Sequence, residues 1–217
     1  GNDFAISIKM NSADFQKGGF SPEDSIQVAK LFSDSGIDNI EISGGTYEQP
    51  RLLGLDKVSI NPKRSENRRE STIAREAYFL SYAEEIARVV NIPLMVTGGF
   101  RTKAGMEAAL ADGACEIVGV GRPLCANPYA IKELLAGQIN ELPKYEKTLS
   151  IGPWWLSPTS PFRLIQAINA FSAQAWFYQQ IKKMGKGLMP DLNLKPWKAF
   201  REDAKADQEA TKEYQNF

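Results

Sequence analysis

The 217-residue chain contains no histidine, and this absence excludes several kinds of active site. Without an imidazole, the chain cannot form a Ser-His-Asp triad, a histidine-ligated metal site or a histidine acid–base group by itself. Its two cysteines, Cys115 and Cys125, are too few for a four-cysteine zinc or iron–sulfur site. Two cysteines in a chain of this size also give no sign of a disulfide scaffold. We therefore expect no metal site.

Net charge and long apolar runs are also lacking. The 26 Lys and Arg residues balance the 26 Asp and Glu residues, so the chain lacks the basic excess of nucleic-acid and membrane-surface proteins. No apolar run approaches the ~18 residues of a membrane span. Residues Gly1 to Phe4 show neither the basic nor the apolar part of a signal peptide. We expect a cytoplasmic protein with no nucleic-acid or membrane partner.

Short apolar segments alternate with helical patterns over the first part of the chain. The expected strands cover residues 4–10, 39–43, 92–97 and 116–121. The expected helices cover residues 21–36, 71–90, 102–112 and 127–135. These strands lack a clear polar–apolar alternation, which is typical of parallel strands buried on both faces. The fold class is therefore α/β, with four βα units.

The sequence changes character at Gly137, where an aromatic, helical part begins. We predict two domains, residues 1–136 and residues 137–217. A helix is expected over residues 161–184, and residues 201–217 form either a surface helix or a frayed end. The polar segment at residues 46–69 is longer than a typical loop, so it is either functional or mobile.

Glycines and an arginine follow two consecutive strands. Gly98, Gly99 and Arg101 follow the third strand, and Gly121 and Arg122 follow the fourth. Glycine lets backbone N–H groups approach an anion closely, and a guanidinium forms a bidentate fork that suits phosphate. In barrel enzymes the loops after the last two strands form the usual phosphate site. The pattern predicts a phosphate-bearing ligand; the alternative is that the glycines serve tight turns and the arginines are solvated.

A dinucleotide-binding fingerprint is not complete in this region. Gly119 and Gly121 supply the first two glycines of G-x-G-x-x-G, but Leu124 stands in place of the third. A doubly wound NAD-binding domain is therefore disfavoured.

Lys9 lies inside the first expected strand, where a cation is costly unless it is paired or lies at the strand's carboxyl end. It either holds a negative or electron-rich ring edge there or pairs with Glu41 on the next strand. The spacing favours neither interpretation. Asn11, Asp14, Glu41 and Ser43 also lie within or just after strands, where barrel enzymes keep working residues. Paired carboxylates are one interpretation, and loop caps are the more common one.

Several of these segments together resemble the NADH:flavin oxidoreductase/Old Yellow Enzyme family. The matching segments are Ile8–Asn11, Ile40–Gly45, Ser71–Phe79, Val96–Arg101 and Val120–Leu124. The resemblance extends over about residues 4–200 and rests on the order and spacing of several motifs. It covers the second half of the family's barrel, the fifth to eighth βα units, and its C-terminal extension.

The resemblance implies a partial (β/α)8 TIM barrel that binds FMN. The family uses NAD(P)H to reduce activated alkenes such as enones. Lys9 matches the family's basic residue beside the flavin pyrimidine edge. The first phosphate loop is matched by Gly98, Gly99, Phe100 and Arg101, and the second by Gly121 and Arg122. The family's substrate-anchoring pair and tyrosine proton donor lie outside this sequence, so no catalytic residue is assigned.

A half barrel has open sheet edges and a face that the other half normally covers. We therefore expect the chain to self-associate or to pair with the missing N-terminal half, and to be inactive or nearly so alone. Two alternatives stay open. One is a non-catalytic half-barrel module for phosphate binding or assembly. The other is an FMN barrel of the 2-hydroxy-acid oxidase or dihydroorotate dehydrogenase type, although the absent histidine counts against the oxidase.

Overall fold

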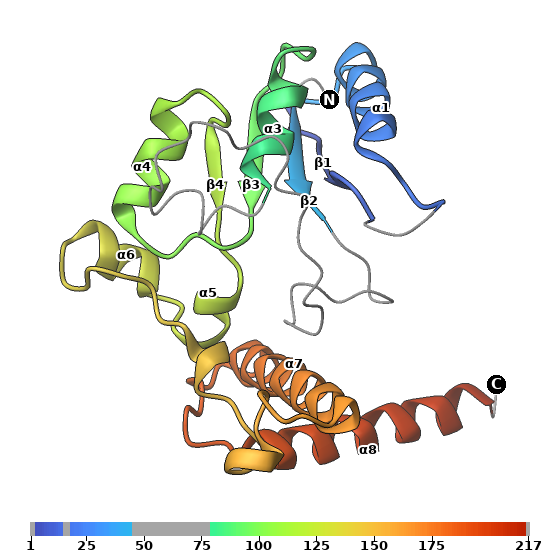
Figure 1. Cartoon of the computed structure of the whole chain (residues 1–217), viewed down its shortest axis with the longest axis vertical. Helices are drawn as coiled ribbons and strands as arrows, with labels where there is room; N and C mark the ends of the chain where they lie inside the picture. Colours follow the sequence, from blue (N-terminus) through green and yellow to red (C-terminus); the bar gives the residue numbers. More distant parts are fainter. Residues whose placement is uncertain (1–2, 15–17, 45–78, 216–217) are drawn as a thin grey trace. The chain divides into compact units, whose positions relative to one another are not determined.

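The computed structural model describes residues 3–14, 18–44 and 79–215, which form two compact units (Figure 1). The first unit contains Gly1–Gly121 and Leu134–Leu142, and the second contains Arg122–Glu133 and Pro143–Phe217. Each unit has its own apolar core. The division into domains at residues 136 and 137 stays a prediction.

A four-stranded parallel sheet in the order β1-β2-β3-β4 forms the centre of the first unit (Figure 1). The strands are β1 (Ser7–Asn11), β2 (Asn39–Ser43), β3 (Leu94–Thr97) and β4 (Ile117–Gly119). Neighbours in the sheet are also neighbours in the chain, and every pairing is parallel. The predicted repeat of four βα units is therefore confirmed.

Three helices accompany these strands: α1 (Pro22–Asp34), α3 (Leu80–Ala87) and α4 (Lys103–Ala111). The expected start of α1 is confirmed, because Ser21 and Asp24 form a reciprocal capping box. Thr102 caps α4 by accepting a hydrogen bond from the Gly105 N–H at 3.1 Å. The helix predicted over residues 71–90 ends earlier, at Ala87. Residues 46–69 and 71–78 of the predicted loop and helix lie outside the described residues.

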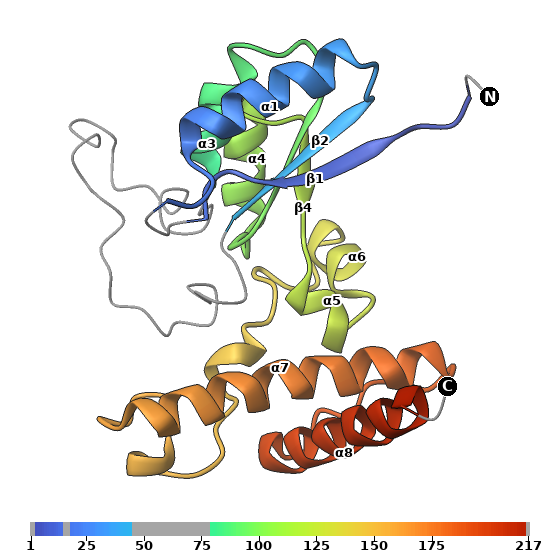
Figure 2. The ribbon, with the colours of Figure 1, turned by 90° about the vertical axis from the view of Figure 1, so that its right-hand side faces the viewer.

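The apolar core of the first unit lies on one face of the sheet. Figure 2 shows α1, α3 and α4 on the same side of the strands. The core combines strand residues and helix residues, among them Ile40, Ile42, Leu94, Val96, Ala29, Ala83, Ile86 and Ala109.

The opposite face of the sheet is open among the described residues. It carries one row of register partners, Lys9, Glu41, Met95 and Ile117, and none of them is buried. The expectation of burial on both faces therefore does not hold among the described residues, whereas the expectation of one uncovered face agrees with the structure. The physical reason is that the inner face of a barrel is covered only when the remaining strands close it.

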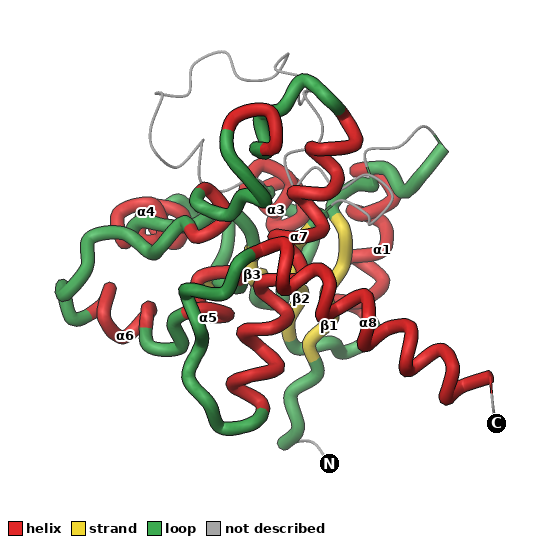
Figure 3. Tube along the Cα trace, turned by 90° about the horizontal axis from the view of Figure 1, so that it is seen from below, coloured by secondary structure: helices red, strands yellow, loops and turns green. Residues whose placement is uncertain are grey.

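The second unit is helical. Its main helices are α5 (Arg122–Ala126), α7 (Arg163–Gly185) and α8 (Pro196–Gln215), and the short helix α6 (Ala130–Leu135) contains residues of both units. The prediction of a helix at residues 161–184 is confirmed. Residues 201–215 belong to α8, in agreement with the surface-helix interpretation. Figure 3 shows the C-terminal end of α8 extending beyond α7. Helix α5 was not expected, because Arg122 was assigned to a loop.

Buried side-chain amides fix the loops of the second unit. The Gln180 side chain donates to the Asp191 carbonyl at 3.1 Å and accepts from the Asp191 N–H at 2.6 Å. The Asn169 side chain accepts from the Ile151 N–H at 3.0 Å and donates to the Leu156 carbonyl at 2.8 Å. Because these amides are buried, their loops have one favoured conformation.

Cys115 makes the stability of the first unit sensitive to alkaline pH. Burial, with a smaller contribution from the negative charge of Glu116, raises the pKa of its thiol to about 11. The unfolded chain therefore loses this proton first, and stability falls as pH rises from about 9 towards 11. We expect this group to lower the free energy of unfolding by at most about 2 kcal/mol across that window. Urea unfolding of the parent and of Cys115→Ala at both ends of the window measures the difference.

Cys125 provides the matched comparison for Cys115, because its thiol is only partly buried. In the native chain, iodoacetamide should modify Cys125 before Cys115, as followed by peptide mass spectrometry. Equal alkylation rates for the two thiols would contradict the burial argument.

Candidate functional site

The candidate site lies where β3 and β4 end. Their last residues, Thr97 and Gly119, are register partners. Because the two strands are parallel neighbours, their carboxyl ends lie on the same edge of the sheet. Gly98 and Gly99 directly follow Thr97, and Gly121 follows Gly119 after one residue. The glycines of the two predicted phosphate loops therefore start from one edge of the first unit.

The backbone conformation at positions 98 and 99 requires glycine. Their φ angles are 131° and 88°, a region that residues with a Cβ rarely adopt. Gly121 differs, because its φ lies outside that region and an added Cβ would meet no described atom within 4 Å. Neither strain nor crowding explains a glycine at 121, whereas an approaching ligand would.

Phe100 and Arg101 turn away from solvent. Phe100 is 1% exposed and belongs to the apolar core, so only its backbone could reach a ligand. Arg101 is 6% exposed, and its Nη1 donates to the Phe100 carbonyl at 2.7 Å. The Arg101 carbonyl accepts from the Leu142 N–H at 2.7 Å, which fixes this loop within the unit. The alternative of a solvated arginine therefore does not hold for Arg101.

Arg122 is the first residue of α5 and belongs to the second unit. Its side chain is half-buried. Its predicted role in the second phosphate loop, like those of Lys9, Gly98, Gly99, Phe100, Arg101 and Gly121, stays a prediction.

Thr97 has a hydroxyl group without a hydrogen-bond partner. Its Oγ1 is buried, and no group among the described residues bonds it. A Cβ on Gly119 would overlap this hydroxyl and would lie 2.7 Å from Cε of Met95, so glycine is needed opposite Thr97. Sequence reasoning assigned Thr97 no role, because an unpartnered hydroxyl depends on the neighbouring strand and leaves no local pattern. A donor beside two conformationally special glycines fits an anionic, phosphate-bearing ligand.

Lys9 pairs with its register partner on the open face of the sheet. Its Nζ lies 2.6 Å from Oε1 of Glu41, and the two side chains are 55% and 19% exposed. Of the two interpretations of Lys9, the structure shows the pairing. Lysine carries three N–H donors, so one salt bridge leaves donors for a ligand. A role at the flavin edge stays a prediction.

Polar residues at the end of β1 and directly after it bond within the following loop. The Asn11 amide donates to Oδ1 of Asp14 at 2.9 Å, and Oδ2 of Asp14 accepts from the Phe20 N–H at 3.1 Å. For Asn11 and Asp14 the structure therefore agrees with the loop-cap interpretation. No group of three metal-ligand side chains occurs in the part of the chain that the structure describes.

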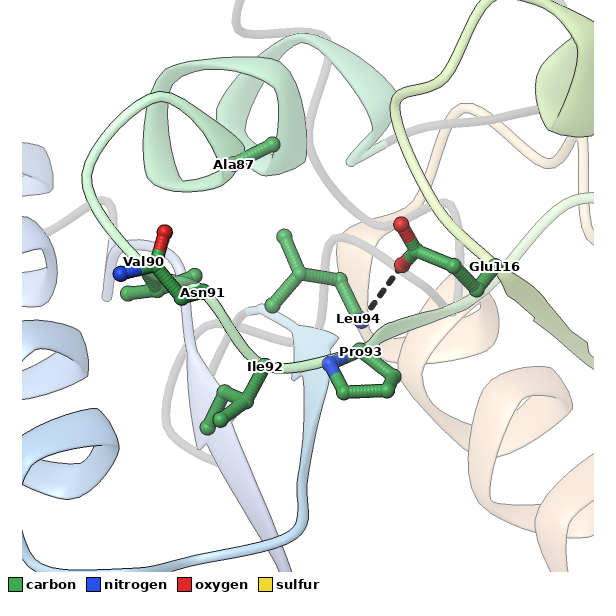
Figure 4. A pocket seen from close by; sticks show the side chains of 7 residues that line it. All are labelled: Ala87, Val90, Asn91, Ile92, Pro93, Leu94 and Glu116. Carbon is green, nitrogen blue, oxygen red and sulfur yellow. Dashed lines mark hydrogen bonds between the residues drawn. The ribbon is translucent and has the colours of Figure 1, made fainter.

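A pocket of about 260 Å³ lies at the opposite edge of the sheet (Figure 4). It is formed around the start of β3 and the end of α3, where the Leu94 N–H donates to Oε2 of Glu116 at 2.8 Å. Since strand amino ends form this edge, the pocket is separate from the candidate site. In barrels this edge serves stability.

The chain is similar to curated proteins named NADH-dependent flavin oxidoreductases. It is 38% identical over 127 residues to iliE of Neonectria sp. (strain DH2), covering 58% of this chain and 16% of that protein. It is 32% identical over 165 residues to iccE of Talaromyces variabilis, covering 74% of this chain and 37% of that protein. An NADH oxidase of Thermoanaerobacter brockii is 30% identical over 184 residues, covering 84% of this chain and 26% of that protein. The chain therefore spans well under half the length of these relatives.

These matches confirm the resemblance inferred from the motifs, over the matched part. No protein-family profile matches the chain. A solved 2-naphthoyl-CoA reductase complex has a TM-score of 0.51 at 24% identity, covering 65% of this chain and 20% of the other. This likeness concerns the fold alone. Together with the four parallel βα units, it confirms a partial (β/α)8 barrel followed by a helical extension.

We expect different effects of substitution at Gly99, which has a positive φ, and at Gly121, which does not. Gly99→Ala forces a side chain into the left-handed region and should lower the free energy of unfolding by about 1–2 kcal/mol. Gly121→Ala, which meets neither strain nor crowding, should change it by less than about 0.5 kcal/mol. Urea unfolding followed by circular dichroism measures both. A destabilising Gly121→Ala would show that this glycine serves the fold.

Proposed function

We propose that this chain, which is homologous to part of the NADH-dependent flavin oxidoreductases, is the portion of such an enzyme that holds the FMN phosphate. The main support is that β3 and β4 are adjacent and parallel, with a glycine-containing loop directly after each. The partnerless Thr97 hydroxyl and the backbone of Gly98 and Gly99 fit an anion at this edge.

Each candidate residue has a distinct task in this proposal. The backbone at Gly98, Gly99 and Gly121 lets N–H groups approach phosphate oxygens. Arg101 adds positive charge from a buried position, where screening by water is weak. Lys9 provides positive charge on the inner face of the sheet for the pyrimidine edge of the flavin.

The complete enzyme would be an NAD(P)H oxidoreductase acting on activated C=C bonds. When bound, FMN supplies hydride transfer between the nicotinamide and an electron-poor, enone-type substrate. This chain contributes four of the eight βα units of such a barrel, so we propose that it is inactive or nearly so by itself. We also propose that it acts in the cytoplasm. As a separate finding, none of the described helices combines the length and the hydrophobicity of a membrane span.

We propose further that the open face of the sheet pairs with a complementary half barrel or with a second copy of this chain. The face carries Met95 and Ile117, and Ile117 is 43% exposed. Strands β1 and β4 end the sheet on either side, and such edges favour pairing with another chain.

The first test of the proposal is direct binding. We expect FMN to bind the purified chain more tightly than riboflavin, because only FMN carries the phosphate. Flavin fluorescence titrations measure both dissociation constants, and inorganic phosphate should compete with FMN. Lys9→Gln should increase the dissociation constants for FMN and riboflavin by the same factor, because it removes a contact to the flavin ring that both share.

Two other outcomes would decide against this function. Equal affinity for FMN and riboflavin would contradict the phosphate site. A chain that binds phosphate but shows no preference for FMN over pyrophosphate would instead support the non-catalytic module.

The second test concerns association. Sedimentation velocity at high protein concentration should show a dimer or larger species. Ile117→Glu on the open face should weaken association, since it places a charge in the contact. Leu110→Glu is the matched control, because Leu110 is 42% exposed but lies on α4. A monomer at all concentrations, or equal effects of both changes, would overturn the pairing proposal.

A further inference from the structure

Buried hydroxyl groups without a hydrogen-bond partner are rare in folded proteins, because each costs free energy of folding. Among the described residues, Ser12, Thr97 and Ser172 each carry one. Ser12 and Ser172 are fully enclosed, with no exposed surface. Thr97 differs, because its side chain is only partly buried although its Oγ1 is covered. Of the three residues, only Thr97 therefore lies where a ligand could approach from the solvent side.

The position of Thr97 distinguishes it further. It is the last residue of β3, and Gly98 and Gly99 follow it with left-handed φ angles. Its register partner is Gly119, where a Cβ would overlap the Thr97 hydroxyl. The neighbouring strand therefore provides space for this hydroxyl but no partner for it.

We propose that Thr97 is a phosphate-binding residue whose hydroxyl donates to a phosphate oxygen of the bound flavin nucleotide. This inference rests on the proposed function and adds a residue to its site. A phosphate monoester ion is rich in acceptor oxygens, so it is the partner that a donor hydroxyl lacks. In the free chain the unpaired hydroxyl lowers stability, and binding of the nucleotide removes that cost.

The test separates the role of the hydroxyl in binding from its role in stability. In Thr97→Val the hydroxyl is replaced by a methyl group of similar size. We expect the Tm of the unliganded variant to rise by about 2 °C. The dissociation constant for FMN should increase about tenfold, a loss of about 1.4 kcal/mol, because one hydrogen bond to a charged acceptor is lost. The dissociation constant for riboflavin should stay unchanged. Thr97→Ser keeps the hydroxyl and should keep the affinity for FMN.

The matched control is Ser172→Ala, which removes another unpartnered buried hydroxyl from α7 in the second unit. It should raise the Tm in a similar way and leave FMN affinity unchanged. Thermal denaturation and fluorescence titration of the same samples give both quantities.

The outcomes distinguish this inference from the function on which it rests. If the parent chain binds FMN no better than riboflavin, both fail. If the parent chain prefers FMN and Thr97→Val keeps that preference, the role of Thr97 fails and the proposed function stands. A lower Tm in Thr97→Val, or equal weakening of both flavins, would show a structural role for the hydroxyl and would also overturn the inference.

Discussion

The parallel pairing of β3 with β4 determines the geometry of the candidate site. Because Thr97 and Gly119 are register partners, the loops that follow them begin at one edge. The same register brings the Thr97 hydroxyl against a residue without a side chain. A shift of one residue would turn Thr97 to the other face of the sheet. The sequence of the two glycine-containing loops would be unchanged, but the loops could no longer bind the same ligand together.

The sequence predicted most of what depends on short stretches of chain. The helices expected from Ser21 and from Thr102 follow from local patterns, and the structure shows both residues as N-caps. The parallel βα repeat was likewise visible in the alternation of apolar segments and helical patterns. Features that depend on distant partners were missed. The burial of Arg101 and the unpartnered hydroxyl of Thr97 each require knowledge of neighbouring strands.

Similarity to known proteins and physical reasoning support different parts of the assignment. The relatives support a flavin and NADH for the family, while the chain covers only 16% to 37% of the lengths of the three compared relatives. The structure adds which residues of this portion share one edge. Gly98, Gly99 and Gly121 do so, whereas Phe100 contributes its side chain to the core. The residues of one motif therefore have different roles, and the burial and backbone angles of each residue indicate which role it has.

The salt bridge between Lys9 and Glu41 has a consequence for how this barrel can vary. Its row also contains Met95 and Ile117, so two opposite charges stand beside two apolar side chains. Loss of either charged residue alone would leave the other without its partner on the open face. We therefore expect the effect of a substitution at position 9 to depend on the residue at position 41.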